Sequence, residues 1–558
     1  MRSRFFRAPC GALPPERAGR PRPAVGAKPR FWPCLFLLLL LALPEASFGA
    51  ASAAVADAAM QQDGAAVRAL LDQHADANAP QADGTTALHW AARWNDLEMA
   101  GSLIAAGANP RASNRDGATP LFLACVNGSA PMIARLLQAG ADPNAPFLLH
   151  GETPLMMAAR SGSVPAVQAL LDRGARVDAR ETLRGTTALM WAAEQGHASV
   201  VRLLLRHGAD PAVQSKVLTP IQRRGLGFAR GAGPNLPRGP AIGGVTALIL
   251  ATRQGELASV EALLAAGARV DQTSADGSSP LLVAVQNGFY EIARLLLNRG
   301  ASPNLANRKG WTPLYLAVKN RNQETTAIPA PDTAGVLPFI RALLDRGANP
   351  NLRIQADTEV HQGMTALWLK EAGATPLLRA ALSGDLTVVR LLLDHGADPL
   401  LATFDHTTPL MVASGVGWAD GMIHEHSEQE TLQVIHLLLD AGADVNAAND
   451  HGITALHGAA YKGANQAVQL LVDRGARLDA KDKGEDYGFG ASTVPMTPLN
   501  WAEGVPIGMS SAIYHTDTVA LLTRLMQARG IPVVSNTFQG RKPAGYNFGN
   551  PAGDATSH

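Results

Sequence analysis

The sequence predicts an all-α fold, a solenoid of about 11–12 stacked helix–turn–helix units with β-hairpin finger loops between them. Three observations support this prediction. A phrase of the form Thr-Pro-Leu or Thr-Ala-Leu recurs, a leucine-rich phrase ending in Gly recurs as well, and the spacing is regular. The marker leucines from Leu88 to Leu189 lie 33 or 34 residues apart, and those from Leu248 to Leu314 lie 33 apart. The eleven copies begin at Asp83, Asp116, Gly151, Arg184, Gly244, Asp276, Lys309, Ala374, Thr407, His451 and Met496.

Each copy of the first phrase predicts the start of a helix. In Thr119-Pro120 the Thr is a good N-cap, and Pro suits the first helical position because it lacks the N–H that would be unpaired there. Leu121 and Ala124 then lie on one face of that helix. Pairs such as Ala91-Ala92 allow neighbouring helices to approach closely.

The second phrase predicts a second helix that ends at a glycine. It reads VVRLLLRHGAD from Val200 and VVRLLLDHGADP from Val388. Gly208 and Gly396 stand where the C-terminus of a helix needs a left-handed backbone, and the Asp that follows favours a turn. Neither helix can bury its apolar face alone, so the units are expected to stack around one continuous core.

With these residues the chain resembles the ankyrin-repeat family, whose signature joins a Thr-Pro-Leu-His helix start, paired Ala, a Leu-rich second helix and a Gly-Ala-Asp or Asn turn. The resemblance covers roughly residues 54–530. It implies a scaffold that binds a protein partner through a concave groove. The signature histidine remains only at His89 and His457, where we expect a hydrogen bond at the helix start rather than a metal or catalytic role.

The repeat pattern also divides the chain into segments. An atypical N-terminal capping repeat is expected at the beginning of the array, and the tail after the last repeat is rich in Gly, Pro, Asn and Ser and is expected to be irregular. The predicted segments are a signal peptide at 1–50, the capping repeat at 54–82, repeats at 83–211, a basic insertion at 212–243, repeats at 244–530 and the irregular tail at 531–558.

The N-terminal 50 residues have the layout of a secretion signal. Basic residues precede the apolar run from Phe31 to Leu43, and small residues follow it near Ala50 and Ala53, where cleavage is expected. The run holds 13 residues, fewer than the roughly 20 that a membrane-spanning helix needs. We therefore expect a periplasmic or secreted protein without stable membrane insertion after cleavage.

Cleavage would remove two of the three cysteines and change the net charge from +1 to about −5. Only Cys125 would remain, so no intrachain disulfide is expected, and its apolar surroundings predict a buried, unreactive thiol. The nearly cysteine-free chain fits a bacterial envelope. The remaining chain holds 40 Lys and Arg against 45 Asp and Glu, which argues against nucleic acid as a partner. We expect a monomer that binds a protein.

Five insertions interrupt the repeats and are the sequence's best indication of a specialised surface, although inert solvated loops would look the same. Three lie between repeats and would lengthen the fingers, and two lie between the helices of one repeat. They are 212–243, 352–373 and 483–495 between repeats, and 320–335 and 415–429 within repeats.

Two of the insertions carry residues with distinctive chemistry. The 212–243 insertion has no acidic residue and includes Arg223 and Arg224, which favours an anionic partner. Its GLGFARG stretch lacks the glycine spacing of a phosphate-binding loop, so no cofactor is expected. The 415–429 insertion holds His424 and His426, which could coordinate a metal if another ligand joined them or could form an exposed polar turn.

Three functions are compatible with these features. An interaction scaffold is the main hypothesis, a secreted host-directed effector is the second, and a metal-dependent accessory or enzyme built on the insertions is the third. No catalytic motif is present, and neither catalytic nor metal residues are assigned. The candidate partner-binding residues are Asn114, Arg115, Asp116, Arg223, Arg224, Arg308, Lys309, His424, His426, Asp450 and His451.

Overall fold

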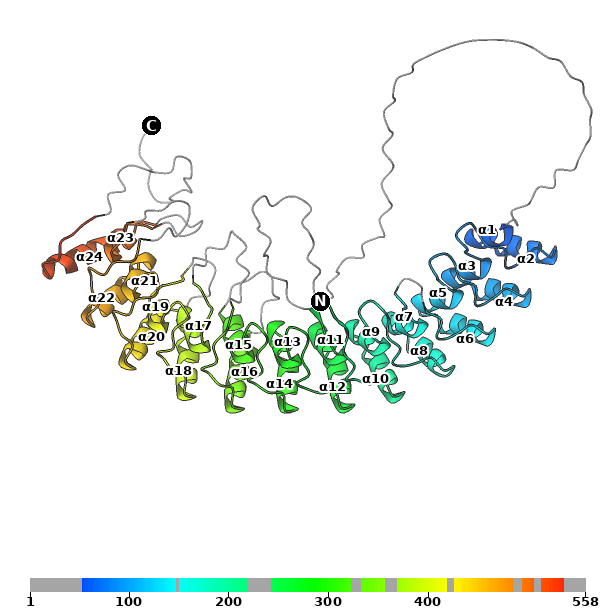
Figure 1. The fold of residues 1–558 in the computed structure, drawn as a ribbon, viewed down its shortest axis with the longest axis horizontal. Coiled ribbons are helices and arrows are strands. Elements are labelled where there is room, and N and C mark those ends of the chain that lie inside the picture. The colour runs from blue at the N-terminus through cyan, green and yellow to red at the C-terminus, as the bar shows by residue number, and fades with distance from the viewer. Residues whose placement is uncertain are drawn as a thin grey trace, which may run out of the picture. The chain divides into compact units, whose positions relative to one another are not determined.

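The computed structural model describes residues 53–146, 150–218, 242–322, 333–356, 369–418, 426–484, 494–505 and 513–535. Within these residues, 24 α-helices form twelve consecutive pairs, and the pairs stack side by side (Figure 1). The predicted all-α solenoid is therefore confirmed. The predicted signal peptide and the candidates Arg223, Arg224 and His424 lie outside the described residues.

The helices alternate between two layers of the stack. The first helices of the pairs are α1 (Ala54–Met60), α3 (Ala87–Trp94), α5 (Pro120–Val126), α7 (Pro154–Ser161), α9 (Ala188–Glu194), α11 (Ala247–Gln254), α13 (Pro280–Gln286), α15 (Pro313–Arg321), α17 (Pro376–Leu382), α19 (Pro409–Ala413), α21 (Ala455–Lys462) and α23 (Pro498–Ala502). The second helices are α2 (Gly64–Asp72), α4 (Leu97–Ala105), α6 (Ala130–Gln138), α8 (Val164–Leu171), α10 (Ala198–Arg206), α12 (Leu257–Ala265), α14 (Tyr290–Asn298), α16 (Thr333–Asp345), α18 (Leu386–Asp394), α20 (Glu428–Asp440), α22 (Asn465–Asp473) and α24 (Thr516–Ala528).

The helix boundaries follow the predicted capping chemistry. The side chain of Thr119 accepts a hydrogen bond from the N–H of Phe122 at 3.2 Å, and Pro120 occupies the first position of α5. At the other end of the pair, Gly208 has a φ of 85°, which L side chains rarely adopt. The Thr cap and the Gly stop predicted from the sequence are thus both present.

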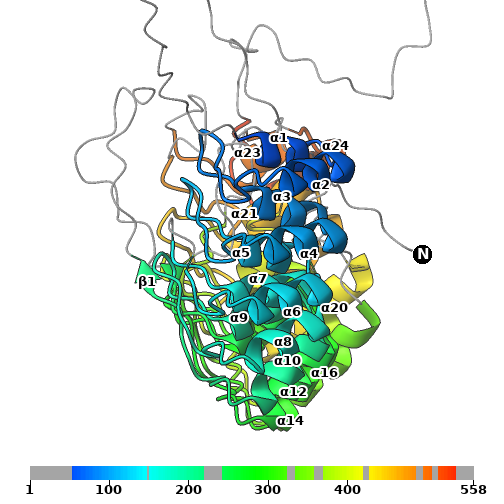
Figure 2. The same ribbon diagram turned by 90° about the vertical axis from the view of Figure 1, so that its right-hand side faces the viewer.

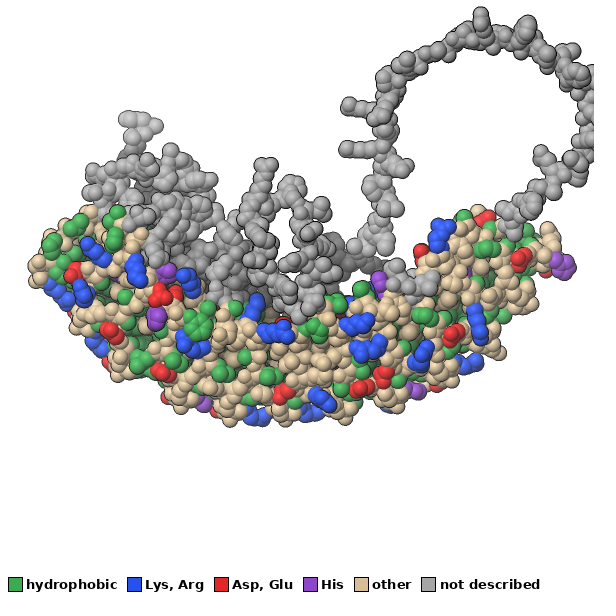
Figure 3. Space-filling model, in the orientation of Figure 1, with side chains coloured by type: hydrophobic (Ala, Val, Ile, Leu, Met, Phe, Trp, Pro, Cys, Tyr) green, Lys and Arg blue, Asp and Glu red, His purple; other side chains and the backbone are tan. Residues whose placement is uncertain are grey.

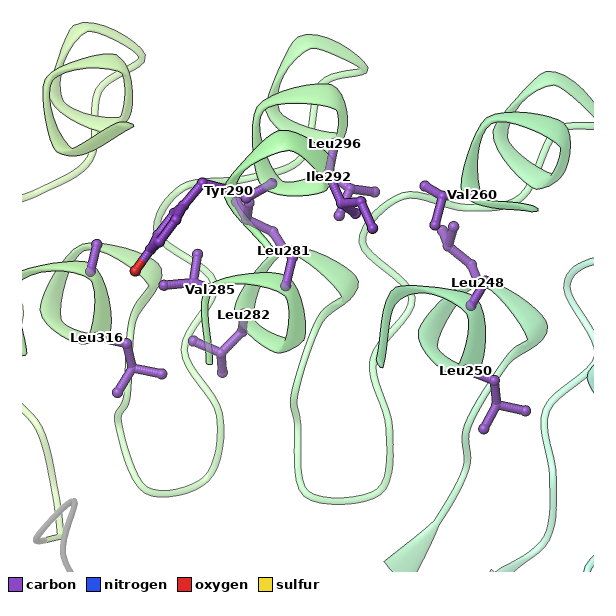
Figure 4. Close-up of a cluster of buried hydrophobic side chains, with 14 of the residues drawn as sticks. Leu248, Leu250, Val260, Leu281, Leu282, Val285, Tyr290, Ile292, Leu296 and Leu316 are labelled. Atoms are coloured by element: carbon purple, nitrogen blue, oxygen red, sulfur yellow. The ribbon is translucent and has the colours of Figure 1, made fainter. Parts of the chain in front are cut away.

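Each helix packs mainly against its own partner and against the equivalent helices of the neighbouring pairs. The core consequently runs along the array rather than towards one centre. Figure 4 shows a part of it, where Leu248 of α11, Leu281 of α13 and Tyr290 of α14 contribute buried side chains to one continuous layer. Such an array is stabilised by contacts between neighbours only.

Finger loops connect the pairs and project to one side of the helices (Figure 2). At three of them the described residues that flank the predicted insertions between repeats are paired with each other. In the first, β1 (Val217–Leu218) pairs antiparallel with β2 (Ile242–Gly243). In the second, Ile354 N–H donates to Ala374 O at 3.1 Å, and in the third Asp482 N–H donates to Met496 O at 3.0 Å.

The two insertions within repeats differ from their predicted bounds. Helix α15 continues to Arg321, and α16 already begins at Thr333, so residues at both ends of the predicted 320–335 insertion are helical. Residues 415–418 form turns beside α21, and α20 begins at Glu428. Both helix extensions were hidden from the sequence pattern because they follow no repeat phrase.

The ends of the array are closed differently. Helices α1 and α2 pack on α3 and α4 and bury Val55, Ala56 and Val67, although α1 lacks a side-chain cap. After α24, residues 531–535 are irregular and return to α23, where the side-chain amide of Asn500 donates to Val534 O at 3.0 Å. Among the described helices, none has both the length and the apolar character needed to cross a membrane.

Candidate functional site

Of the three candidate residues in the finger between α4 and α5, one stabilises the finger itself and two are exposed at its tip. Asn114 is half-buried, and its Oδ1 accepts the N–H of Ala118 at 2.9 Å, so it stabilises its own turn. Arg115 and Asp116 are exposed at the tip. Arg115 also donates from its guanidinium to Ala82 O at 2.9 Å, which joins two neighbouring fingers. Two of these three candidates therefore remain accessible to a partner.

The later finger candidates have intramolecular partners. Arg308 and Lys309 are both exposed, and the Lys309 ammonium lies 4.5 Å from the ring centroid of Trp311. Asp450 is exposed and pairs with Nδ1 of His406 at 2.8 Å. His451 Nε2 lies 3.1 Å from the Lys370 ammonium. The Asp450–His406 contact joins two consecutive fingers, and the Lys370–His451 contact joins fingers two repeats apart.

His426 has a different environment from the exposed loop predicted for it. Its Nε2 lies 3.2 Å from Asn322 Oδ1 and 3.7 Å from the carboxylate of the fully buried Asp385. The guanidinium of Arg321 donates to the same carboxylate at 2.7 Å. Buried charges need such partners. His426 therefore anchors the segment before α20 to α15 and α18, rather than presenting a free imidazole to a partner.

A metal centre finds no support in the part of the chain that the structure describes. No group of three or more His, Cys, Asp or Glu side chains in it lies close enough to hold a metal ion. Cys125 is buried in α5, and burial raises the pKa of its thiol far above the usual value. The prediction that this cysteine is buried is confirmed, and the raised pKa favours an unreactive thiol.

The inner side of the array is the surface lined by the first helices (Figure 1). The exposure of its side chains changes along the chain. One position can be followed through the repeats, seven residues after the Thr or Ser that caps each first helix, and we call it the seventh position. This position is exposed in Arg93, Arg160, Arg253 and Gln286, Val126 is 51% exposed, and Glu194 is half-buried. From α15 to α21 it is buried, in Lys319 (7% exposed), Leu382, Gly415 and Tyr461. We call the exposed part, from α3 to α13, the open inner face.

The chain itself covers the inner side from α17 to α21. Glu371 lies over α17, with its carboxylate 3.8 Å from the guanidinium of the buried Arg379. Leu369 lies so close to Gly417 that a Cβ at Gly417 would be 2.7 Å from the Leu369 Cβ. The ring of Trp418 packs edge-on against Tyr461 of α21. Parts of two insertions thus occupy the place that a partner would use.

Tryptophan and arginine side chains dominate the open inner face. Trp90 and Trp94 of α3 stack with their ring centroids 6.0 Å apart, and the Arg93 guanidinium lies within 6 Å of both rings. Two repeats further on, the guanidinium groups of Arg160 and Arg184 lie 5.5 and 5.9 Å from the ring centroid of Trp191. Such cation–π contacts position arginine without neutralising its charge.

The carboxylates near this face are largely engaged in their own turns. Hydrogen bonds from the N–H and hydroxyl of Thr85 lower the pKa of Asp83. Burial alone would raise the pKa of Glu181, but donors from Thr186 and Arg184 outweigh it and lower the pKa. On the first helices α3 to α13 the one acidic residue, Glu194, pairs with Arg253 at 3.3 Å. Figure 3 shows Lys and Arg side chains distributed along the repeats beside apolar ones.

Sequence reasoning missed the arginine–tryptophan clusters and the division of the inner side. The clusters join residues of different repeats, such as Arg160 and Trp191, so no local pattern shows them. The division did leave a trace in the sequence. At the fourth helical position, where the early repeats have Trp, Leu or Met, α21 has Gly458, and the seventh position, which is polar in α3, α7 and α11, becomes Leu382 and Tyr461.

Stacked helix pairs with Thr-capped first helices and projecting finger loops define a helical repeat protein of the solenoid class. The family model described as ankyrin repeats in three copies matches residues 55–147, 145–215, 231–307, 248–328 and 418–482. The model of the single ankyrin repeat matches 309–354 and 372–404. These matches cover more than half of the chain, so it belongs to the ankyrin-repeat family.

The relatives share only the repeats with this chain. Palmitoyltransferase AKR1 of Lachancea kluyveri is 32% identical over 145 residues, which are 26% of this chain and 17% of the relative. Neurogenic locus notch homolog protein 2 of Homo sapiens is 31% identical over 147 residues, which are 26% of this chain and 5% of the relative. The solved human ASB11 ankyrin repeat domain is 25% identical, covers 48% of this chain and all of its own, and has a TM-score of 0.37.

These similarities identify the class of function and leave the particular function open. The ankyrin-repeat fold is a protein-binding scaffold, so protein–protein interaction is the function class of this chain. The palmitoyltransferase match is confined to a small part of that relative and carries no activity over to this chain.

Proposed function

We propose that the protein is an interaction scaffold of the periplasm or extracellular space, and that its partner lies along the open inner face from α3 to α13. The single observation that supports this binding site is the change, along the array, in the exposure of the side chain at the seventh position of the first helices. Val126 is 51% exposed there, whereas Lys319 and Leu382 are buried. Exposed apolar side chains on a concave surface are typical of binding sites.

The rest of the inner side is less suited to a partner, because segments of the chain itself already cover it. Residues 369–373 and 415–418 occupy it from α17 to α21, and their contacts include the Glu371–Arg379 pair and the Leu369–Gly417 packing. A partner would have to displace these segments and expose the charged Arg379 side chain, which is costly. Binding at the open inner face needs no such rearrangement.

Affinity capture with matched variants tests the binding site. Val126→Asp places a charge on the open inner face, and Leu400→Asp places one at a site of nearly equal exposure, 52%, in the turn after α18. We expect the mature chain and L400D to retain the same partner from an envelope extract, and V126D to lose it. Retention by V126D together with loss by L400D would contradict the proposed site.

The location is tested separately, because it depends on the predicted leader. In the organism that makes the protein, fractionation should place it in the periplasm or the medium, with a mature N-terminus near Ala50 or Ala53. A chain that keeps its first 50 residues and stays in the cytoplasm would refute export and leave the binding site untouched.

A further inference from the structure

We propose that the partner presents an acidic segment, and that a carboxylate of this segment is bound between Arg160 and Arg184 above the indole of Trp191. This inference rests on the proposed function and adds the chemistry of the partner. Arg160 belongs to α7, Arg184 precedes α9, and Trp191 lies in α9, so the site joins two consecutive repeats.

The geometry of the three side chains suits carboxylate recognition. Both guanidinium groups lie within 6 Å of the same ring centroid, and both arginines are exposed. The indole is itself fixed, because it is 7% exposed and its Nε1–H donates to Thr186 Oγ1 at 2.8 Å. A guanidinium that rests on a fixed ring keeps its planar fork of N–H donors for a carboxylate and loses less entropy on binding.

Neither guanidinium has a carboxylate partner among the described residues. The neighbouring carboxylate, Glu181, is buried and accepts hydrogen bonds from the N–H groups of Leu183, Arg184 and Thr186. The carboxylate of Glu181 is therefore stabilised by its own turn and is not paired with either guanidinium group. The two arginines present two positive charges on one indole, and such a pair favours binding of an anion.

The surroundings extend the positive charge along the same face. Arg115 and Lys216 donate to the backbone carbonyls of Ala82 and Thr182, which are neutral groups. Arg93 rests on Trp90 and Trp94 in the same way that Arg160 rests on Trp191. A partner segment with several Asp or Glu residues would meet successive cations, and its apolar side chains would meet Trp94 and Val126, both at least 40% exposed.

An acidic protein segment fits these observations better than single-stranded nucleic acid. Nucleic-acid grooves combine positive charge with aromatic faces on which bases stack. Here Trp90 and Trp94 stack on each other, and Trp191 already carries two guanidinium groups. The arginine donors remain open to a partner, and these match the fork of a carboxylate.

The test uses a displayed library of random peptides, selected on the mature wild-type chain and on two charge-reversal variants. R160E/R184E reverses the proposed site. R202E/R206E makes the same change in net charge on exposed residues of α10, a second helix. We expect wild type and R202E/R206E to select peptides rich in Asp and Glu, and R160E/R184E to bind these peptides about tenfold or more weakly. Binding should also weaken as salt shortens the Debye length from about 8 Å towards about 3 Å.

The other outcomes separate this inference from the proposed function. Selected peptides without an acidic bias, or equal affinity of R160E/R184E, would overturn the acidic partner and leave the scaffold in place. A labelled single-stranded oligonucleotide that binds more tightly than any peptide, and is lost in R160E/R184E, would assign the site to nucleic acid. Absence of peptide binding overturns the acidic segment alone if V126D-sensitive capture persists, and overturns both proposals if it does not.

Discussion

His89 and His457 each occupy the third helical position after a Thr cap and connect two repeats. In the second of these, Nδ1 lies 3.2 Å from the N–H of Thr454, and Nε2 lies 3.1 Å from Met496 O in the next finger. The Nδ1 must accept and the Nε2–H must donate, so the network needs the neutral ring. The hydrogen-bonding role predicted for both histidines is thereby confirmed, and burial lowers the pKa of each.

The pH dependence of stability should show this neutral histidine. Burial lowers the pKa of His457 to about 4, from an ordinary value of 6.5. The unfolded chain therefore binds a proton first as the pH falls. Stability should be fully present above pH 6.5 and decrease between pH 6.5 and about 4, by up to about 3 kcal/mol. Urea titrations at a series of pH values, followed by circular dichroism of the helices, would measure it; the ring of Trp501 contacts His457.

His457→Asn is the matched variant, because the chain uses the same solution elsewhere. In the last repeat, Asn500 Oδ1 accepts the N–H of Thr497 at 3.0 Å. The variant should keep the helix cap, lose the bond to Met496 O and become somewhat less stable at neutral pH. Its stability should depend less on pH between 6.5 and 4 than that of the wild type. An unchanged pH dependence would show that His457 is not the group that titrates.

Gly458 illustrates how a helix adapts to a segment that packs on it. It lies in the middle of α21, and a Cβ there would be 2.6 Å from the backbone nitrogen of Val416 and 3.0 Å from the carbonyl carbon of Gly415. Glycine is unfavourable inside a helix by roughly 1 kcal/mol relative to alanine. It is tolerated here because residues 415–418 need the space to cover the inner side.

Gly458→Ala should therefore destabilise the protein, although replacing Gly by Ala inside a helix usually stabilises it. We expect a loss of about 1–3 kcal/mol, because the backbone of residues 415–418 must move away. Hydrogen exchange should become faster in this segment and in α21, and stay unchanged in α3. The control is Gly101→Ala in α4, where the closest atom belongs to the guanidinium end of the Arg135 side chain rather than to backbone, and a gain of up to about 1 kcal/mol is expected. A stabilised G458A would show that these contacts are loose.

At the scale of the whole molecule, stability is a sum of contacts between neighbours. Each helix packs against the other helix of its own pair and against the equivalent helices of the neighbouring pairs. Cooperative unfolding then depends on every interface in the middle of the array. The arrangement also lets one half of the array carry an open inner face while the other half is covered, because neither half constrains the side chains of the other.

Leu281→Ala should weaken the array at one interface and uncouple its two ends. The Leu281 side chain is fully buried in α13, and its truncation should cost about 2–5 kcal/mol locally. We expect urea unfolding of L281A to separate into two transitions. Leu400→Ala, at an exposed site, should change stability by no more than about 0.5 kcal/mol. A single transition at the wild-type midpoint would refute coupling through this interface.

Much of the fold could be predicted because its determinants are local. The Thr119 cap, the glycine at Gly208 and the regular leucines act within one repeat, so the sequence pattern reports them directly. The pattern also indicated where the repeats are interrupted, but the bounds of the insertions within repeats differ because α15 and α16 extend into the predicted 320–335 segment. The candidate site was less predictable. Among the finger candidates Asn114 stabilises its own turn, and His426 is bound to Asn322 and lies close to Asp385, which is far away in sequence.

The sequence by itself determined the repeat, the caps that begin its first helices and the membership in a family of binding scaffolds. Only the tertiary structure decided which part of the inner side is open and where its arginines lie. Equivalent helix positions such as Val126 and Leu382 have the same local pattern, and they differ because other segments cover the second and not the first. Burial and the pairing of charges depend on contacts between residues distant in sequence, such as Arg160 with Trp191, and a one-dimensional pattern does not contain those contacts.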